Sequence, residues 1–247
     1  MANKPQVPKP PRPVQAPKRR DDKSGRGASF LSALPRWVYV VVAVVLVAAI
    51  AGAVFAFAGG SKSTTSSVAS TMVAAGCTYH EVVPLKPTTK TGGYHADVPT
   101  LSTKVKWATF PPSAGAHYPL WAVWGFYTQP VNPRQVVHNE EHGGVILWWG
   151  PKVPASTVNK LQAFYESSPG GMFGTPLAGL GDKVAITAWT GDPSKYSVLQ
   201  NGYHGIGHVA VCRTFDQNAF TAFRDAFRGK GPEGIPLSVD QPGMGPN

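Results

Sequence analysis

One uninterrupted apolar run, residues 38–58, constrains this chain more than any other feature of its sequence. Its 21 residues include no charged or amide side chain, and a helix of that length spans roughly 30 Å, the thickness of a bilayer's hydrocarbon core. A helix buried in a globular domain would show a polar face. The apolar part of a signal peptide is shorter, about 7–15 residues, and lies closer to the chain start. The run therefore predicts one transmembrane helix, with bounds at 36–58.

The charges on either side of this helix predict its orientation. Residues 1–36 carry nine Lys and Arg against two Asp, whereas the remainder carries 14 basic against 11 acidic residues. Because the side richer in Lys and Arg stays in the cytoplasm, we expect a single-pass protein of the cell membrane with an extracytoplasmic C-terminal domain. Residues 1–35 are rich in Pro and Lys, so we expect them to be disordered and to lie near the lipid bilayer, with no nucleic acid as partner.

Composition divides the rest of the chain into a linker, one domain and a tail. Residues 59–73 are rich in Gly, Ser and Thr, which is typical of a flexible linker. Residues 74–236 are long enough for one hydrophobic core, and residues 237–247 are expected to form a flexible tail. Strand and helix patterns mix without a strict βαβ alternation, which predicts an α+β domain with a small, largely antiparallel sheet and two or three helices.

Local patterns locate several of these elements. Helix signals begin near Pro154 and at Asp216, the latter ended by Gly229. Alternation or enrichment in β-branched and aromatic residues marks the expected strands, which are 103–110, 122–127, 145–149, 183–190 and 207–212. We find no internal repeat.

The two cysteines, Cys77 and Cys212, both follow the apolar run. Disulfides persist in an oxidising compartment, and closing so long a loop stabilises a fold by about 5 kcal/mol in the chain-entropy model. Lipidation of Cys77 after "AAGC" is the alternative, but polar residues separate it from the apolar run. We therefore expect a disulfide.

The stretch "VVHNEEHGG" raises the question of a metal or catalytic site. Asn132 and Pro133 favour a helix start and Gly143 a helix end, so we expect a helix over 133–142. On it His138, Glu141 and His142 share one face, whereas Glu140 lies opposite. The metalloprotease pattern H-E-x-x-H is absent.

Two further histidines accompany this helix. His117 lies in a small-residue loop after two prolines, and His95 lies upstream of it. Imidazole and carboxylate groups together bind zinc or copper, although hydrogen-bonded core histidines and an orienting role for Glu141 remain open. His204 and His208 are not expected to be ligands, because the intervening glycines disfavour a helix. The candidate metal ligands are His117, His138, His142, Glu141 and His95.

Four segments also resemble a known family when taken in order. They are 111–117, 121–127, 137–143 and 145–151. They resemble the domain of unknown function 3105 family, extracytoplasmic domains of actinobacterial-type single-pass membrane proteins. The resemblance implies a shared topology and a histidine-rich core, without an established reaction. Ala114, Ala116 and Glu140 stand where that family usually has serine, proline and leucine.

Three functions fit these residues. The first is binding of Cu(II) or zinc by imidazole groups. Cu(I) prefers sulfur ligands, and it is disfavoured because the methionines are scattered and the cysteines are expected to be paired. The alternative is a non-catalytic structural or interaction domain that contacts another membrane or envelope protein. The third is a metal-assisted hydrolase with Glu141 as general base. The sequence lacks a nucleophile elbow, a phosphate-binding glycine loop and a dinucleotide fingerprint, which favours a non-enzymatic role.

Overall fold

Five strands form one mixed sheet with the order β1-β5-β4-β2-β3. The computed structural model describes residues 64–89, 92–192 and 205–246. The strands are β1 (Cys77–Val82), β2 (Val145–Trp149), β3 (Met172–Pro176), β4 (Val184–Thr190) and β5 (Ile206–Cys212). Three of the four pairings are antiparallel, and β2 pairs with β3 in parallel. The predicted α+β class is confirmed. The sheet is mixed because of the parallel β2–β3 pair.

The helices are more numerous than the two or three predicted. In the described ranges they are α2 (Thr64–Ala74), α3 (Gly93–Ala96), α4 (Pro133–His142), α5 (Ala155–Ser167), α6 (Gln217–Phe227) and the 3-10 helix η3 (Leu237–Val239). Helices α5 and α6 begin where the sequence predicts. Asp216 caps α6 by accepting a hydrogen bond from the amide of Ala219.

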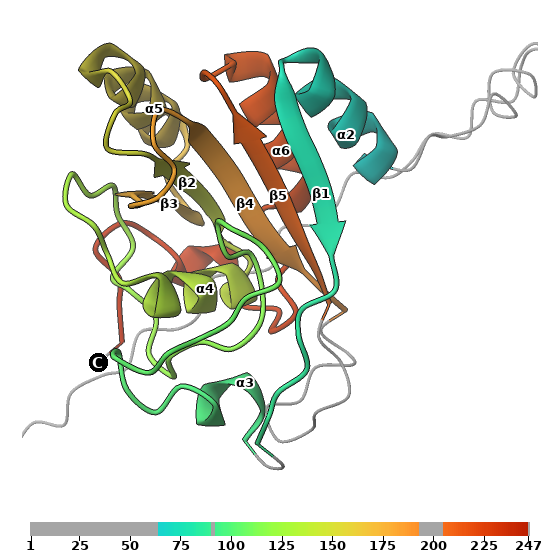
Figure 1. Cartoon of the computed structure of the whole chain (residues 1–247), viewed down its shortest axis with the longest axis vertical. Coiled ribbons are helices and arrows are strands. Elements are labelled where there is room, and N and C mark those ends of the chain that lie inside the picture. Colours follow the sequence, from blue (N-terminus) through green and yellow to red (C-terminus); the bar gives the residue numbers. More distant parts are fainter. Residues whose placement is uncertain (1–63, 90–91, 193–204, 247) are drawn as a thin grey trace, which may run out of the picture. The chain divides into compact units, whose positions relative to one another are not determined.

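Alternating side chains of the strands build a core on each face of the sheet. In β2, Leu147 and Trp149 pack with α5 and α6, whereas Ile146 and Trp148 pack with Val136 of α4. Figure 1 shows α2, α5 and α6 on one side of the sheet and α4 on the other, among the loops that precede it. Helix α4 is thus held between the sheet and these loops.

The bounds of α4 agree with the prediction, and its caps explain why. The side chain of Asn132 accepts a hydrogen bond from the amide of Arg134, and Pro133 occupies the first helical position. At the other end Gly143 has φ 109°, a conformation that favours glycine. Local sequence therefore determines where this helix begins and ends.

Two predicted boundaries are wrong. The expected linker, 59–73, overlaps α2, whose Val68 and Met72 are buried in the core. The expected flexible tail, 237–247, contains η3 and buries Asp240, while Trp124 exchanges backbone hydrogen bonds with Gly243 and Met244. Each segment is fixed in place by a few buried side chains or backbone hydrogen bonds. Its amino-acid composition therefore does not predict that it is folded.

Two of the predicted strands are wrong, and two observed strands were not predicted. Residues 103–110 and 122–127 form no strand, although Phe126 makes an isolated bridge to Gly174. Strands β1 and β3 were not predicted. Both lie at sheet edges, and β3 contains Gly and Pro, which are poor strand formers.

The predicted disulfide is confirmed. Cys77 and Cys212 are directly opposite each other in the β1–β5 register, with sulfurs bonded across 135 residues of sequence. The bond joins the edge strand β1 to β5, its neighbour in the sheet.

The predicted transmembrane helix, 36–58, lies outside the described residues. Among the residues that are described, no helix combines the length and the apolar character needed to cross a bilayer.

Candidate metal centre

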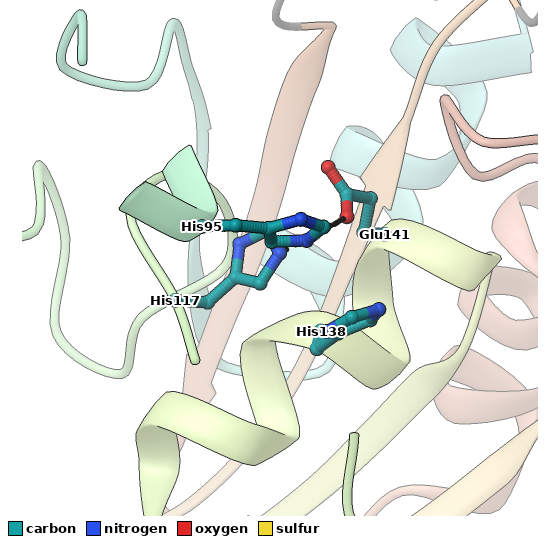
Figure 2. Close-up of side chains that lie close together, drawn as sticks. All are labelled: His95, His117, His138 and Glu141. Atoms are coloured by element: carbon teal, nitrogen blue, oxygen red, sulfur yellow. Dashed lines mark hydrogen bonds and ion pairs between the residues drawn. The ribbon is translucent and has the colours of Figure 1, made fainter. Parts of the chain in front are cut away.

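Four side chains from three segments of the chain meet beside α4 (Figure 2). His138 and Glu141 come from α4, His95 from α3, and His117 from the loop after Pro111. One donor atom of each lies within 4.8 Å of those of the other three. This arrangement is a compact set of three imidazoles and one carboxylate.

The segment carrying His95 is held by Asp97. The carboxylate of Asp97 accepts hydrogen bonds from the backbone amides and hydroxyl groups of both Thr88 and Thr89. Gly92, with φ 86°, precedes α3 in a conformation that a larger residue adopts only with strain. The side chain of His95 is 20% exposed, whereas the other three members of the cluster are buried. His95 is thus the member nearest to solvent.

The ring nitrogens of His117 and His138 are oriented by backbone carbonyls. Nδ1 of His117 lies 2.6 Å from the carbonyl oxygen of Gly115, and Nδ1 of His138 lies 2.9 Å from that of Tyr118. A carbonyl only accepts, so each Nδ1 carries the proton, and Nε2 keeps its lone pair when the ring is neutral. Nε2 of His117 is buried and has no hydrogen-bond partner of suitable geometry among the described residues, although Oε2 of Glu141 lies close to it.

Glu141 supplies the negative charge of the cluster. Its Oε2 lies 3.2 Å from Nε2 of His95 and 3.0 Å from Nε2 of His117. Burial raises the pKa of this carboxyl group, but the electrostatic attraction of His117 and the contacts with His117 and His95 lower the pKa by more than burial raises it, to well below its ordinary value. Burial, then the charge of His117, also lowers the pKa of His138 to about 2. An ionised carboxylate therefore faces at least one neutral imidazole.

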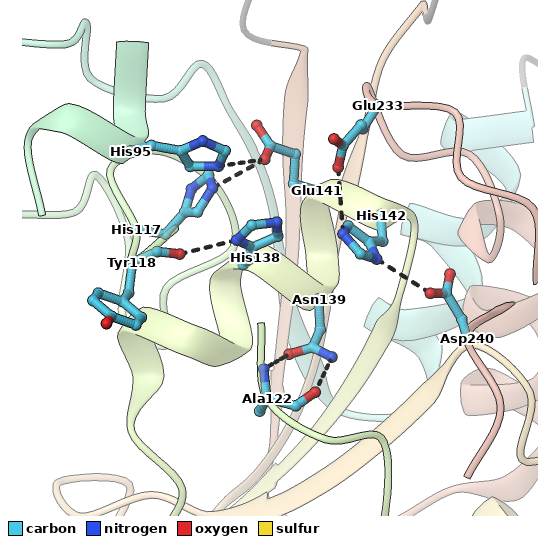
Figure 3. Close-up of polar contacts among 10 residues, drawn as sticks. All are labelled: His95, His117, Tyr118, Ala122, His138, Asn139, Glu141, His142, Glu233 and Asp240. Atoms are coloured by element: carbon cyan, nitrogen blue, oxygen red, sulfur yellow. Dashed lines mark hydrogen bonds and ion pairs between the residues drawn. The ribbon is translucent and has the colours of Figure 1, made fainter. Parts of the chain in front are cut away.

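His142 lies in a neighbouring group with Glu233, and His138 adjoins both groups, since ligand atoms of His138, His142 and Glu233 lie within 4.8 Å of one another. The single cluster that the helical spacing predicts is thus divided into two groups that share His138. Nδ1 of His142 lies 3.2 Å from Oδ1 of Asp240, and its Nε2 lies 3.4 Å from Oε2 of Glu233 (Figure 3). The ring is therefore placed between two carboxylates on the side of α4 that faces the C-terminal segment.

The loop carrying Glu233 is packed backbone to backbone against the end of α4. The amide of Gly229 donates to the carbonyl of Gly143, and the amide of Glu233 donates to that of Glu141. A Cβ atom at Gly231 would collide with the backbone of Gly143 and Glu141. Glycine is required at position 231 because no side chain fits.

A pocket of about 700 Å³ opens beside both groups. Its lining includes His95, His138, His142, Glu233 and the thioether of Met244. The ring of Trp121 lies 4.7 Å from that of His142, measured between centroids, and forms part of the wall. Solvent can therefore approach the two groups from one side.

Glu140 is buried on the opposite side of α4. Its Oε1 accepts a hydrogen bond from the hydroxyl of Thr187, which itself accepts one from Nε1 of Trp148 at 2.7 Å. Burial raises the pKa of this carboxyl group well above its ordinary value. Adjacent glutamates thus have opposite electrostatic surroundings, and Glu140 takes no part in the cluster.

Sequence reasoning missed three residues of the site. Asn139 holds the loop over α4, because its amide pairs with both backbone groups of Ala122. Glu233 and Asp240 were not considered, since they lie about a hundred residues further along the chain without any local pattern. Asp240 lies in the segment that was predicted to be a flexible tail, and the sequence of that segment did not indicate a site residue.

His208 lies outside both groups, and His204 lies outside the described residues. Nδ1 and Nε2 of His208 contact the hydroxyls of Tyr79 at 2.9 Å and Thr190 at 2.8 Å, and its ring stacks on Phe227. Burial lowers its pKa to about 4. Oε1 of Glu81 lies 3.8 Å from Nδ1 of His208.

We expect His208 to make stability depend on pH. The unfolded state binds a proton near pH 6.5 and the folded state only near pH 4, so stability falls between these values by about 3 kcal/mol as the pH is lowered. Urea denaturation at several pH values should show this loss in the wild type and a smaller one in His208→Gln. The exposed His80→Gln serves as control, and equal slopes in all three proteins would rule out the assignment.

Comparison with known proteins gives one match. No curated protein and no solved structure matches the chain. A family model described as a protein of unknown function (DUF3105) matches residues 99–238, which include His117, His138, Glu141 and Glu233. His95 and Asp240 lie just outside the matched range. The match covers more than half of the chain, which therefore belongs to the DUF3105 family.

Proposed function

We propose that the protein binds a transition metal ion, zinc or copper(II), through His95, His117, His138 and Glu141. The observation that carries this proposal is the convergence of four donor atoms within 4.8 Å of one another. Ligand atoms of a tetrahedral zinc ion are about 3.3 Å apart, given bonds of about 2 Å, so small side-chain shifts suffice. Three imidazoles and a carboxylate suit both ions.

The surroundings of the cluster support this proposal. Metal-binding histidines commonly donate their second ring N–H to a carbonyl or carboxylate, which fixes the tautomer. His117 and His138 both make such a contact through Nδ1. The ionised Glu141 would offset part of the charge of a divalent cation in this buried place.

The two alternatives rest on the role of Glu141. Its contacts with His95 and His117 also fit a purely structural, hydrogen-bonded core in a domain that interacts with another envelope protein. As general base of a hydrolase, Glu141 would have to face a substrate, yet its side chain is only 4% exposed and faces two histidines. We therefore rank the hydrolase last.

Metal analysis of the full chain, purified without an affinity tag, tests the proposal. We expect the wild type and the exposed-site control His80→Gln to retain a tightly held metal ion, and His117→Gln to lose it. An unchanged metal content in His117→Gln would refute this site. A wild type without bound metal, even after incubation with zinc or copper(II), would favour the structural domain.

We also propose that residues 36–58 anchor the protein in the cell membrane with its N-terminus in the cytoplasm. The apolar run and the excess of basic residues before it support this orientation. Protease added to intact cells should then release the domain that follows. Complete protection of that domain, with degradation after cell lysis, would contradict the orientation.

A further inference from the structure

The group around His142 resembles a metal ligand with its orienting partner. Asp240 is 1% exposed and accepts a hydrogen bond from Nδ1 of His142. Because Nδ1 carries the proton in this contact, the lone pair of the neutral ring is on Nε2. Nε2 is the ring nitrogen that lies next to Glu233. The same carboxylate–imidazole pairing commonly orients histidines that bind metal ions.

Glu233 completes a pair of donor atoms at His142. Its Oε2 lies 3.4 Å from Nε2, close to the separation of about 3.3 Å between two ligand atoms of one metal ion. This oxygen is buried and has no hydrogen-bond partner among the described residues. The hydrogen bond that the backbone amide of Glu233 donates to the carbonyl of Glu141, with the close contact of Gly231, fixes the backbone that carries this side chain.

His138 adjoins this pair, because one of its ring nitrogens lies within 4.8 Å of the ligand atoms of His142 and Glu233. Its Nδ1 donates to the carbonyl of Tyr118, which leaves Nε2 as its one ligand atom. We assign this nitrogen to the inner cluster, so His142 and Glu233 are the two protein ligands on this side. The pocket of about 700 Å³, which His142 and Glu233 both line, leaves room for water to complete a coordination shell.

We propose that His142 and Glu233 form a second divalent-cation site, oriented by Asp240 and adjacent to the inner centre. This inference rests on the proposed metal-binding function. With two protein ligands and water from the pocket, the second site binds more weakly than the inner site and exchanges its ion with solvent. The competing arrangement is a protonated His142 that forms ion pairs with Glu233 and Asp240 and holds no metal.

Zinc titration of the full chain in detergent, stripped with a chelator and followed by calorimetry and native mass spectrometry, separates these arrangements. We expect two zinc ions per wild-type chain, the second weaker. His142→Gln and Glu233→Gln each bind one ion, with the affinity of the inner site retained. Asp240→Asn weakens the second site about 10- to 100-fold, as expected for loss of an orienting partner. His117→Gln loses the inner site and keeps the weaker one.

Glu166→Gln, an exposed carboxylate on α5, is the matched control and should bind two ions. One ion per wild-type chain overturns the second site. If its affinity is then unchanged in Glu233→Gln, the ion-pair arrangement is correct. If its affinity falls in both Glu233→Gln and His117→Gln, the two groups form one shared site. A wild type that binds no zinc refutes the proposed function itself.

Discussion

Removing the Cys77–Cys212 disulfide should lower the free energy of unfolding by about 5 kcal/mol. The bond closes a loop spanning 135 residues of sequence, and a crosslink of this span reduces the entropy of the unfolded chain by about that amount. The loss is large compared with the typical total stability of a domain, about 5–15 kcal/mol.

The position of the disulfide at the edge of the sheet increases the structural effect of removing it. Within the described part of the chain β1 pairs only with β5, and the disulfide joins the two strands at a directly opposed pair. Urea denaturation of Cys77→Ser/Cys212→Ser should show the loss. The wild type in reductant should approach the stability of the double variant, whereas the variant itself should not respond to reductant. A difference below about 1 kcal/mol would show that the unfolded-state account is wrong here.

Saturating zinc should raise the free energy of unfolding by about 4 kcal/mol if the inner centre binds it. An ion that binds only the folded state has this effect at a free concentration of about 1,000 times its dissociation constant. For a domain of this size the unfolding temperature should rise by about 8–16 °C. Chelation should reverse the shift.

The variants assign this stabilisation to particular residues. His117→Gln and Glu141→Gln each remove one ligand of the inner centre, so zinc should shift their unfolding temperatures far less. His80→Gln keeps the centre and should respond like the wild type. A shift of equal size in all four proteins would indicate unspecific binding and would count against the centre.

Local sequence was sufficient to predict α4 and part of the cluster. Asn132, Pro133 and Gly143 determine the ends of the helix through contacts within a few residues. The spacing of His138 and Glu141 then places both side chains on one face. The pairing of the two cysteines was equally accessible, because no other cysteine competes.

Helical spacing could not separate His142 from the cluster. Positions four apart share a helix face, but the direction of the ring is decided by Asp240, 98 residues further along the chain. Glu233 depends likewise on a loop that packs by its glycine backbone. Interactions between distant segments of this kind leave no periodicity in the sequence.

The edges of the domain were misjudged for a related reason. α2 buries Val68 and Met72 against the core, and this i, i+4 pair is the signal that the Ser- and Thr-rich composition obscured. The segment around Gly243 is held by backbone hydrogen bonds with Trp124. Such bonds are independent of side-chain type, so no compositional measure predicts them.

The close contact of Gly231 with the end of α4 has a consequence for motion. Because backbone groups of Gly143 and Glu141 bond directly to the 229–233 loop, this wall of the pocket moves together with the helix. We therefore expect any widening of the pocket to come from its other lining segments, the short helix α3 with His95 and the segment around Met244. Such an opening would preserve the separation of His142 and Glu233 and change the distance from His95 to Glu141.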